Sequence, residues 1–231
     1  MTEKNQAVLD RLRGGLVVSC QALPDEPLHS SFIMSRMAYA AFLGGAVGIR
    51  ANTVTDITEI RKTVDLPIIG IIKQVYEDHP DVYITPTMAE VDALVECGVE
   101  IIALDATRRV RPGGRSLAEF FAEVRAKYPD QLFMADCADF EDGMAAAAMG
   151  FDLIGTTMAS YTPYTVGCDL PPYGMIAALV RECGKPVVAE GNIGTPAQLR
   201  EAMDLGVLTV VVGGAITRPM QITQKFVAAL K

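Results

Sequence analysis

The sequence predicts a single (β/α)8 barrel with an N-terminal helix. Eight apolar segments rich in β-branched residues alternate with eight segments that have the spacing of amphipathic helices. The length of 231 residues suits this fold, because barrels of this kind take about 250 residues. Repeated strand–helix units imply parallel strands, and eight parallel strands close into a barrel.

The predicted strands are 15–21, 46–50, 67–73, 100–105, 132–136, 153–157, 186–190 and 208–213. The predicted helices are 34–43, 53–63, 87–97, 116–127, 139–149, 173–183, 196–204 and 219–230. Thr53 and Asp139 are expected as N-caps, and Pro196 and Pro219 are expected in first turns. Several helical segments stop at a glycine, which commonly ends a helix.

We expect one catalytic barrel domain, residues 14–231, with residues 1–13 forming a polar helix that caps the barrel. An open doubly wound sheet is the alternative arrangement of the same units. Such a sheet carries a Gly-x-Gly-x-x-Gly turn after its first strand, but here Cys20 begins the sequence CQALPD instead. The barrel is therefore the prediction.

The composition excludes several classes of protein. A net charge of −8 without a basic patch argues against a nucleic-acid partner. The chain has no apolar run near the ~20 residues of a membrane helix, so no membrane partner is expected. Five cysteines without a CxxC pair favour a reduced interior and the cytoplasm, with Cys20 and Cys137 in the core. His29 and His79 form no metal-ligand pattern.

The predicted strands end on polar residues. In a barrel, the residue at the carboxyl end of each strand faces the active-site mouth. In chain order these residues are Gln21, Arg50, Lys73, Asp105, Asp136, Thr157, Glu190 and Gly213. Five of the eight are charged, which is unusual for apolar strands. This ring predicts an active site, although Asp136 and Lys73 could instead form a buried ion pair.

Lys73 and Glu190 are the candidate catalytic pair. They end the third and seventh predicted strands, which lie opposite each other in an eight-stranded barrel. Gln21 and Asp136 can share their layer. Two opposed groups suit the removal of a proton from one face of a carbon and its return to the other face. Burial and nearby Arg50 favour a neutral lysine while carboxylates oppose it, and an apolar enclosure favours a protonated glutamate.

A phosphate site is predicted at the last two strands. Gly213 and Gly214 let a ligand approach the backbone closely, and Arg218 lies just before a helix. The glycine-rich turn that begins at Gly191 follows the neighbouring strand. Barrels commonly bind phosphate at these two loops. The expected substrate is a small phosphorylated metabolite whose far end reaches the catalytic pair.

Seven segments together resemble the N-acylglucosamine-6-phosphate 2-epimerase family. They are VVSCQALPDEPL (17–28), IIGIIK (68–73), LDATRRVRP (104–112), MADC (134–137), GTTM (155–158), AEGNI (189–193) and VGGAITR (212–218). The resemblance runs in order from about residue 14 to the C-terminus. It implies conversion of N-acetylmannosamine 6-phosphate to N-acetylglucosamine 6-phosphate in bacterial sialic-acid breakdown.

The resemblance also implies roles for the site residues. Lys73 is then the catalytic base, and Glu190 is its acid/base counterpart or orients the sugar. The residues implied in substrate binding are Gln21, Arg50 and Asp136 for the sugar, and Gly191, Gly213, Gly214 and Arg218 for the phosphate. Family members use no metal or organic cofactor and are often homodimers.

Two positions depart from the family pattern. Ala159 and Ser160 stand where many relatives carry a glycine, and Asn192 stands where many carry a basic residue. Both positions bear on the preferred N-acyl group. Two other functions stay open: a Schiff-base lyase in which Lys73 forms an imine, and a non-catalytic sugar-phosphate-binding barrel. The absence of paired histidine ligands argues against a metal-dependent epimerase.

Overall fold

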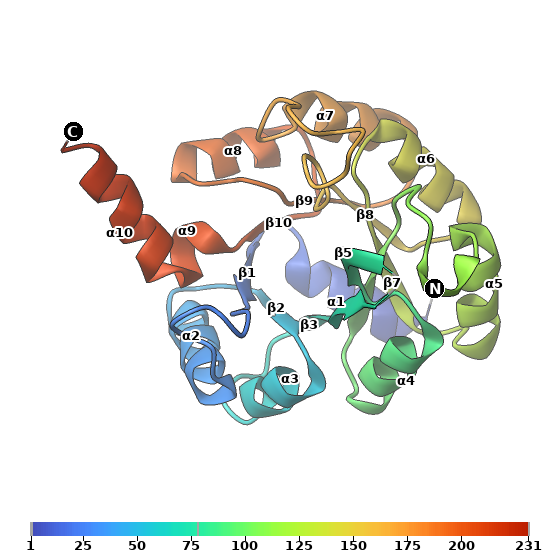
Figure 1. Ribbon diagram of the computed structural model, residues 1–231, viewed down its shortest axis with the longest axis horizontal. Helices are drawn as coiled ribbons and strands as arrows, with labels where there is room; N and C mark the ends of the chain where they lie inside the picture. The colour runs from blue at the N-terminus through green and yellow to red at the C-terminus, as the bar shows by residue number, and fades with distance from the viewer. Residues whose placement is uncertain (1, 78, 231) are drawn as a thin grey trace.

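Eight parallel strands form a closed barrel, as predicted (Figure 1). The structure is a computed structural model that describes residues 2–77 and 79–230. Around the barrel the strand order is β1-β10-β9-β8-β7-β6-β3-β2. The strands are β1 (Leu16–Cys20), β2 (Gly48–Asn52), β3 (Ile68–Ile71), β6 (Ile101–Asp105), β7 (Leu132–Asp136), β8 (Leu153–Gly155), β9 (Val187–Ala189) and β10 (Thr209–Val212). Each overlaps one predicted strand.

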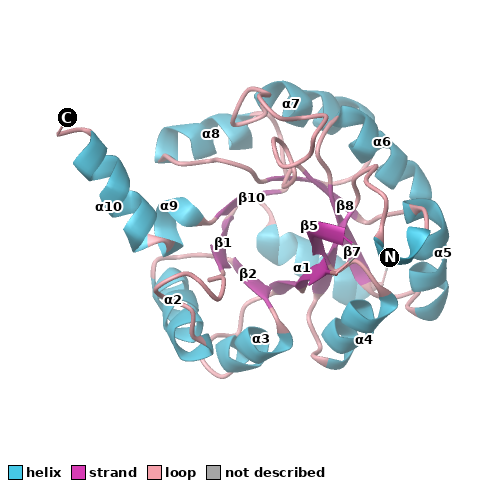
Figure 2. Cartoon of the chain, viewed as in Figure 1, coloured by secondary structure: helices cyan, strands magenta, loops and turns pink. Residues whose placement is uncertain are grey.

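Helices cover the outside of the barrel, alternating with its strands (Figure 2). They are α2 (Ser31–Leu43), α3 (Val54–Arg61), α4 (Met88–Glu96), α5 (Leu117–Lys127), α6 (Phe140–Met149), α7 (Tyr173–Glu182) and α8 (Pro196–Asp204), with a 3₁₀ turn at Pro112–Gly114. The predicted caps are confirmed. Thr53 accepts a hydrogen bond from the amide of Asp56 at 3.2 Å, and Asp139 accepts one from Asp142 at 2.9 Å. No helix among the described residues is long and apolar enough to cross a bilayer.

The first helix, α1 (Glu3–Leu12), packs on the interior of the barrel. Its buried residues Val8, Leu9 and Leu12 belong to one apolar cluster with inward-facing strand residues such as Ile101 and Val188. In Figure 2, α1 is visible behind the opening of the ring of strands. The contacts of α1 are therefore with side chains inside the ring of strands.

A two-stranded antiparallel hairpin interrupts the alternation after β3. It consists of β4 (Lys73–Tyr76) and β5 (His79–Ile84), in a stretch that was expected to be a long connection. The predicted third strand is too long at its end. The amide of Ile72 donates to Thr85 Oγ1 at 3.2 Å, and the amide of Thr85 donates to Ile72 O at 2.7 Å. These bonds lead the chain out of the barrel ladder, so that Lys73 opens the hairpin.

The C-terminal segment forms a short helix, α9 (Gly214–Thr217), and then α10 (Pro219–Ala228). The predicted helix at 219–230 is thus present, but its main contacts are with α9 rather than with the barrel strands. None of its described residues is buried, and Figure 1 shows it projecting away from the other helices. Phe226 is 74% exposed on this helix. Met220, Val227 and Leu230 are exposed in the same segment.

Candidate active site

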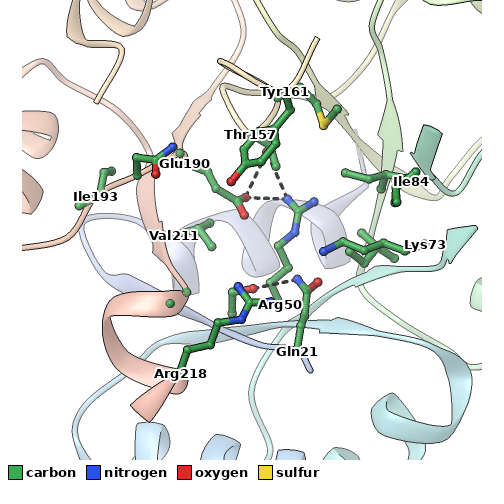
Figure 3. A pocket seen from close by; sticks show the side chains of 18 of the residues that line it. Gln21, Arg50, Lys73, Ile84, Thr157, Tyr161, Glu190, Ile193, Val211 and Arg218 are labelled. Atoms are coloured by element: carbon green, nitrogen blue, oxygen red, sulfur yellow. Dashed lines mark hydrogen bonds and ion pairs between the residues drawn. The ribbon is translucent and has the colours of Figure 1, made fainter. Parts of the chain in front are cut away.

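A cavity of about 520 Å³ opens at the carboxyl ends of the strands. Residues of the β4–β5 hairpin border it, among them Val82 and Ile84, and so does the start of α9. Figure 3 shows how the side chains converge on this space. The predicted site residues that line it are Gln21, Arg50, Lys73, Glu190, Gly191, Gly213, Gly214 and Arg218. Asp136 is the predicted site residue that does not.

Lys73 and Glu190 approach the cavity from opposite sides. Lys73 follows β3 and Glu190 follows β9, and these strands stand four places apart in a ring of eight. Figure 3 shows the two side chains on either side of Arg50. The sequence therefore predicted the opposition of the pair, although Lys73 lies just past its strand.

The Lys73 amine is free to act on a ligand. It makes no hydrogen bond or ion pair with any residue in the described part of the chain. The lysine backbone is fixed, because its amide donates to Asn52 Oδ1 at 2.9 Å. Burial lowers the pKa of Lys73 to about 8, aided by the charges of Arg50 and Arg218 and opposed by those of Glu190 and Asp136. About a tenth of the amine is therefore neutral at pH 7, far more than for an ordinary lysine.

Arg50 links two carboxylates beneath the cavity. Its Nη1 donates to Glu190 Oε2 at 2.7 Å and to Asp136 Oδ1 at 3.1 Å, and its Nη2 donates to Asp136 Oδ2 at 2.6 Å. The hydroxyl of Thr157 lies 2.6 Å from Asp136 Oδ1 and 3.1 Å from Glu190 Oε2. Asp136 is fully buried and its oxygens are taken up here. It pairs with Arg50 rather than with Lys73, and its position suits holding Arg50 rather than touching a ligand.

Glu190 keeps one oxygen available to a ligand. Its Oε2 accepts from Arg50, but its Oε1 makes no hydrogen bond with any residue that the structure describes. Burial raises the pKa of Glu190, the charge of Arg50 opposes that rise, and the charge of Asp136 adds to it. The glutamate is thus more easily protonated than an exposed one, as an acid in this place requires.

Gln21 presents an unsatisfied acceptor. Its Nε2 donates to Ser19 Oγ at 2.8 Å, while its buried Oε1 has no partner among the described residues. Both residues line the cavity. Because a buried acceptor without a partner is costly, a ligand hydroxyl that donates to Oε1 would be favoured here.

The residues of the predicted phosphate site come together because they follow the neighbouring strands β9 and β10. Gly191 has φ 115°, a backbone conformation that other residues rarely adopt. Gly213 precedes α9, whose first amides have no partners within the helix. Arg218 lies on the same side of the cavity (Figure 3). Amides, glycines and an arginine at one end of the cavity form a suitable environment for a phosphate.

Several lining residues were not among the predicted site residues, and they include Thr157, Arg109, Tyr161 and Lys225. Thr157 was identified only as a strand end. Arg109 follows β6 and reaches the cavity because its guanidinium is held by buried Asp105 and lies 4.3 Å from the ring centre of Tyr83. Lys225 lies on α10, and the sequence holds no signal that would bring that helix to the mouth.

The expected core cysteines are buried and do not line the cavity. Burial raises the pKa of Cys20 to about 12 and the pKa of Cys137 well above its usual range. Neither thiol is poised as a nucleophile. The described residues contain no group of three histidine, cysteine, aspartate or glutamate side chains that could hold a metal ion.

The two departures from the family pattern share an unusual backbone. Ser160 has φ 71° and Asn192 has φ 56°, both in the left-handed region. Asparagine tolerates this region, whereas serine is strained in it. Asn192 lines the cavity, and Ser160 precedes the lining residue Tyr161.

Comparisons with known proteins agree on one family. Residues 34–231 match the family described as "Putative N-acetylmannosamine-6-phosphate epimerase". A relative of the corresponding name from Caldanaerobacter subterraneus subsp. tengcongensis is 49% identical over 224 residues, which is 97% of this chain and 94% of the relative. A relative from Clostridium perfringens is 51% identical over 224 residues, with 97% and 100% covered.

A solved structure has the same fold over nearly the whole chain. It is the N-acetylmannosamine-6-phosphate 2-epimerase from Clostridium perfringens, with a TM-score of 0.90 and 50% identity, covering 96% of this chain and 95% of that one. A thiamine phosphate pyrophosphorylase from Pyrococcus furiosus, at 16% identity and a TM-score of 0.59, shares the barrel fold alone.

Proposed function

Since the chain belongs to the family of N-acetylmannosamine-6-phosphate epimerases, we propose that it is the 2-epimerase that interconverts N-acetylmannosamine 6-phosphate and N-acetylglucosamine 6-phosphate. The observation that carries this proposal is the Lys73 amine, which has no partner among the described residues and a pKa of about 8, facing Glu190 across the cavity. The two sugars differ only at C2. When the ring is open, C2 adjoins an aldehyde, so its proton is acidic enough for a neutral lysine to remove.

The phosphate end fixes how the sugar lies. With the phosphate at the glycine turns and Arg218, the opened chain extends toward Lys73. Neutral Lys73 takes the C2 proton, and the electron pair of that C–H bond moves into an enolate on the C1 oxygen. Arg50 lines the cavity between the two catalytic groups and is placed to stabilise this charge. The unsatisfied oxygen of Gln21 accepts from a sugar hydroxyl.

Two routes return the proton to the opposite face of C2. In the first, Glu190 donates it through Oε1, which its raised pKa and free oxygen favour. In the second, Lys73 serves both faces with help from a substrate hydroxyl, and Glu190 orients the sugar. A Glu190→Gln variant separates them. If Glu190 is the donor, this variant exchanges the C2 proton of the substrate in heavy water but forms little product.

The function is tested by incubating N-acetylmannosamine 6-phosphate with the protein in heavy water. The proton NMR signal at C2 should disappear as product forms. Lys73→Met should abolish both exchange and product formation. Product that keeps its C2 proton would rule out this mechanism, and no product at all would rule out the assignment.

A lowered lysine pKa also suits a Schiff-base lyase. Borohydride separates the two functions, because reduction traps a substrate imine on Lys73 and should leave an epimerase active. Mass spectrometry of the treated protein would show the adduct. Its presence, with cleavage of the sugar, would replace the epimerase proposal.

We also infer a homodimer in the cytoplasm. The outlying α10, with its exposed Phe226, provides apolar surface that a second copy can cover. The cytoplasm follows from the substrate, because a sugar phosphate carries charge and does not cross a bilayer unaided.

A further inference from the structure

The guanidinium of Arg218 is held along one edge by Glu26. Arg218 Nε donates to Glu26 Oε1 at 2.5 Å, and Arg218 Nη2 donates to Glu26 Oε2 at 3.1 Å. Two parallel bonds of this kind fix both the position and the plane of a guanidinium. The partners are 192 residues apart in the chain, so the contact forms only in the folded barrel.

Glu26 is itself held in place. Its Oε2 accepts from the amide of Leu23 at 2.7 Å, and the amide of Glu26 donates to Leu23 O at 2.9 Å. The amide of His29 donates to Glu26 O at 3.0 Å, which closes the next turn. Partial burial raises the pKa of Glu26, but the hydrogen bonds from Arg218 and Leu23 outweigh it and lower that pKa. The carboxylate therefore stays ionised as a firm acceptor.

The remaining edge of Arg218 makes no hydrogen bond with any residue that the structure describes, and it lies toward the predicted phosphate site. Its Nη1 takes no part in the pair with Glu26, and it lies 3.9 Å from the point where a Cβ on Gly214 would stand. In Figure 3 the guanidinium extends from the start of the C-terminal helices into the cavity. The carboxylate thus occupies the edge that faces away from the glycine turn.

We propose that Glu26 is a positioning residue that orders Arg218, so that Nη1 is aimed at the substrate phosphate before it binds. This rests on the proposed function, since it assigns the phosphate to Arg218. Without Glu26, a long side chain in an open mouth would lose rotamer freedom on binding, which weakens affinity. Glu26 also carries a negative charge near an anion site, and ordering of Arg218 outweighs that repulsion.

The test is Glu26→Gln, which keeps the shape but turns one oxygen into a donor that cannot accept from Arg218. KM for N-acetylmannosamine 6-phosphate should rise about tenfold, as expected when a charge-assisted pair is lost. The kcat should change much less. The inhibition constant of inorganic phosphate should rise by a similar factor, and Glu26→Asp should recover part of both.

A matched control exists at the other end of the barrel. Glu100 also accepts from an arginine, Arg61, at 2.6 Å and from a backbone amide, that of Ile68, at 2.8 Å. The side-chain exposures are similar, 26% and 22% in this pair against 27% and 15% for Arg218 and Glu26. Glu100→Gln should lower the melting temperature to a similar extent and leave KM and phosphate inhibition unchanged.

A second comparison shows whether Glu26 acts through Arg218. In an Arg218→Lys background, which has no planar edge to hold, Glu26→Gln should add little to KM. Additive effects would overturn the proposal, and so would an unchanged or lowered KM in the single variant. If the wild-type protein does not turn over the sugar at all, the proposed function fails. Binding of inorganic phosphate to the wild type and to Glu26→Gln, by calorimetry, then tests Glu26 independently.

Discussion

Arg50 donates to both carboxylate oxygens of Asp136, with Nη1–Oδ1 at 3.1 Å and Nη2–Oδ2 at 2.6 Å, beneath the cavity. The pair ties β2 to β7 across the barrel interior and sets the plane of the guanidinium. Arg50 can then reach Glu190 with Nη1 while still lining the cavity. A buried charge is tolerated only when it is paired, so the catalytic floor depends on this contact.

The first prediction concerns this pair. Asp136→Asn should lower the free energy of unfolding by about 1.5–3 kcal/mol, because buried Arg50 loses charge-assisted hydrogen bonds to Asp136 but keeps its pair with Glu190. Activity should fall with it, as Arg50 loses its fixed plane. Chemical unfolding and initial rates would measure both effects.

The control for Asp136 is Asp92→Asn, which breaks an exposed pair with Lys127. That change should cost less than about 1 kcal/mol. Equal stability of the two variants would show that the buried Arg50–Asp136 pair contributes no more to folding than an exposed pair.

The second prediction is a pH profile set by Lys73. A lysine is protonated below its pKa and cannot then accept a proton, so kcat/KM should rise with pH through about 8.

The charges around the amine predict how variants shift the rising limb of this pH profile. Glu190 raises the lysine pKa and Arg218 lowers it. The limb should therefore move to lower pH in Glu190→Gln and to higher pH in Arg218→Gln. Residual rates measured over pH 6–10 would show the shifts, and shifts in one common direction would exclude Lys73 as the titrating base.

The third prediction concerns backbone strain at Ser160. Its φ of 71° strains the backbone of a residue that has a Cβ, which destabilises the folded state, but it does not strain a glycine. Ser160→Gly should raise the free energy of unfolding by about 0.5–1 kcal/mol, after allowing for the greater freedom of glycine in the unfolded chain. Ser116→Gly is the control, because Ser116 caps α5 at an ordinary φ of −71°. It should lower stability by a few tenths of a kcal/mol. Thermal unfolding of both variants checks the opposite signs.

The fourth prediction tests the homodimer. Phe226→Asp places a charge in the exposed apolar surface of α10 and should shift the protein toward the monomer in light scattering. Gln224→Asp on the same helix adds the same charge without removing an apolar side chain, and it should leave the mass unchanged. If light scattering shows that the parent protein is a monomer, the proposed homodimer is ruled out.

Much of the site could be predicted because strand ends in a parallel barrel converge by geometry. Gln21 and Glu190 directly follow apolar strands, so their place at the mouth followed from periodicity alone. Arg50 was predicted to end its strand, but β2 continues to Asn52, so Arg50 lines the cavity from within the strand. The opposition of Lys73 and Glu190 followed from counting strands. The glycine turns were predictable because only glycine accepts conformations such as that of Gly191.

Other features depend on contacts between distant segments. The hairpin that carries Lys73 forms because Ile72 bonds to Thr85 rather than to the neighbouring strand, and no local pattern indicates that choice. The family resemblance implies that Asp136 binds the sugar, and the residues alone left open an ion pair with Lys73. In the fold its carboxylate is taken up by Arg50, because a guanidinium from β2 is long enough to reach it.

The sequence by itself determined the closed barrel, the end of the barrel at which the cavity opens and the residue types that gather there. The strand period, the helix period and the backbone positions that require glycine depend on residues close together in the chain, so the sequence shows them directly. Only the tertiary structure decided which charge pairs with which. It paired Asp136 and Glu190 with Arg50 and Glu26 with Arg218, and it left the Lys73 amine without a partner among the described residues. Pairing depends on distance and burial in three dimensions, and these fix the lowered pKa of Lys73 on which the proposed chemistry depends.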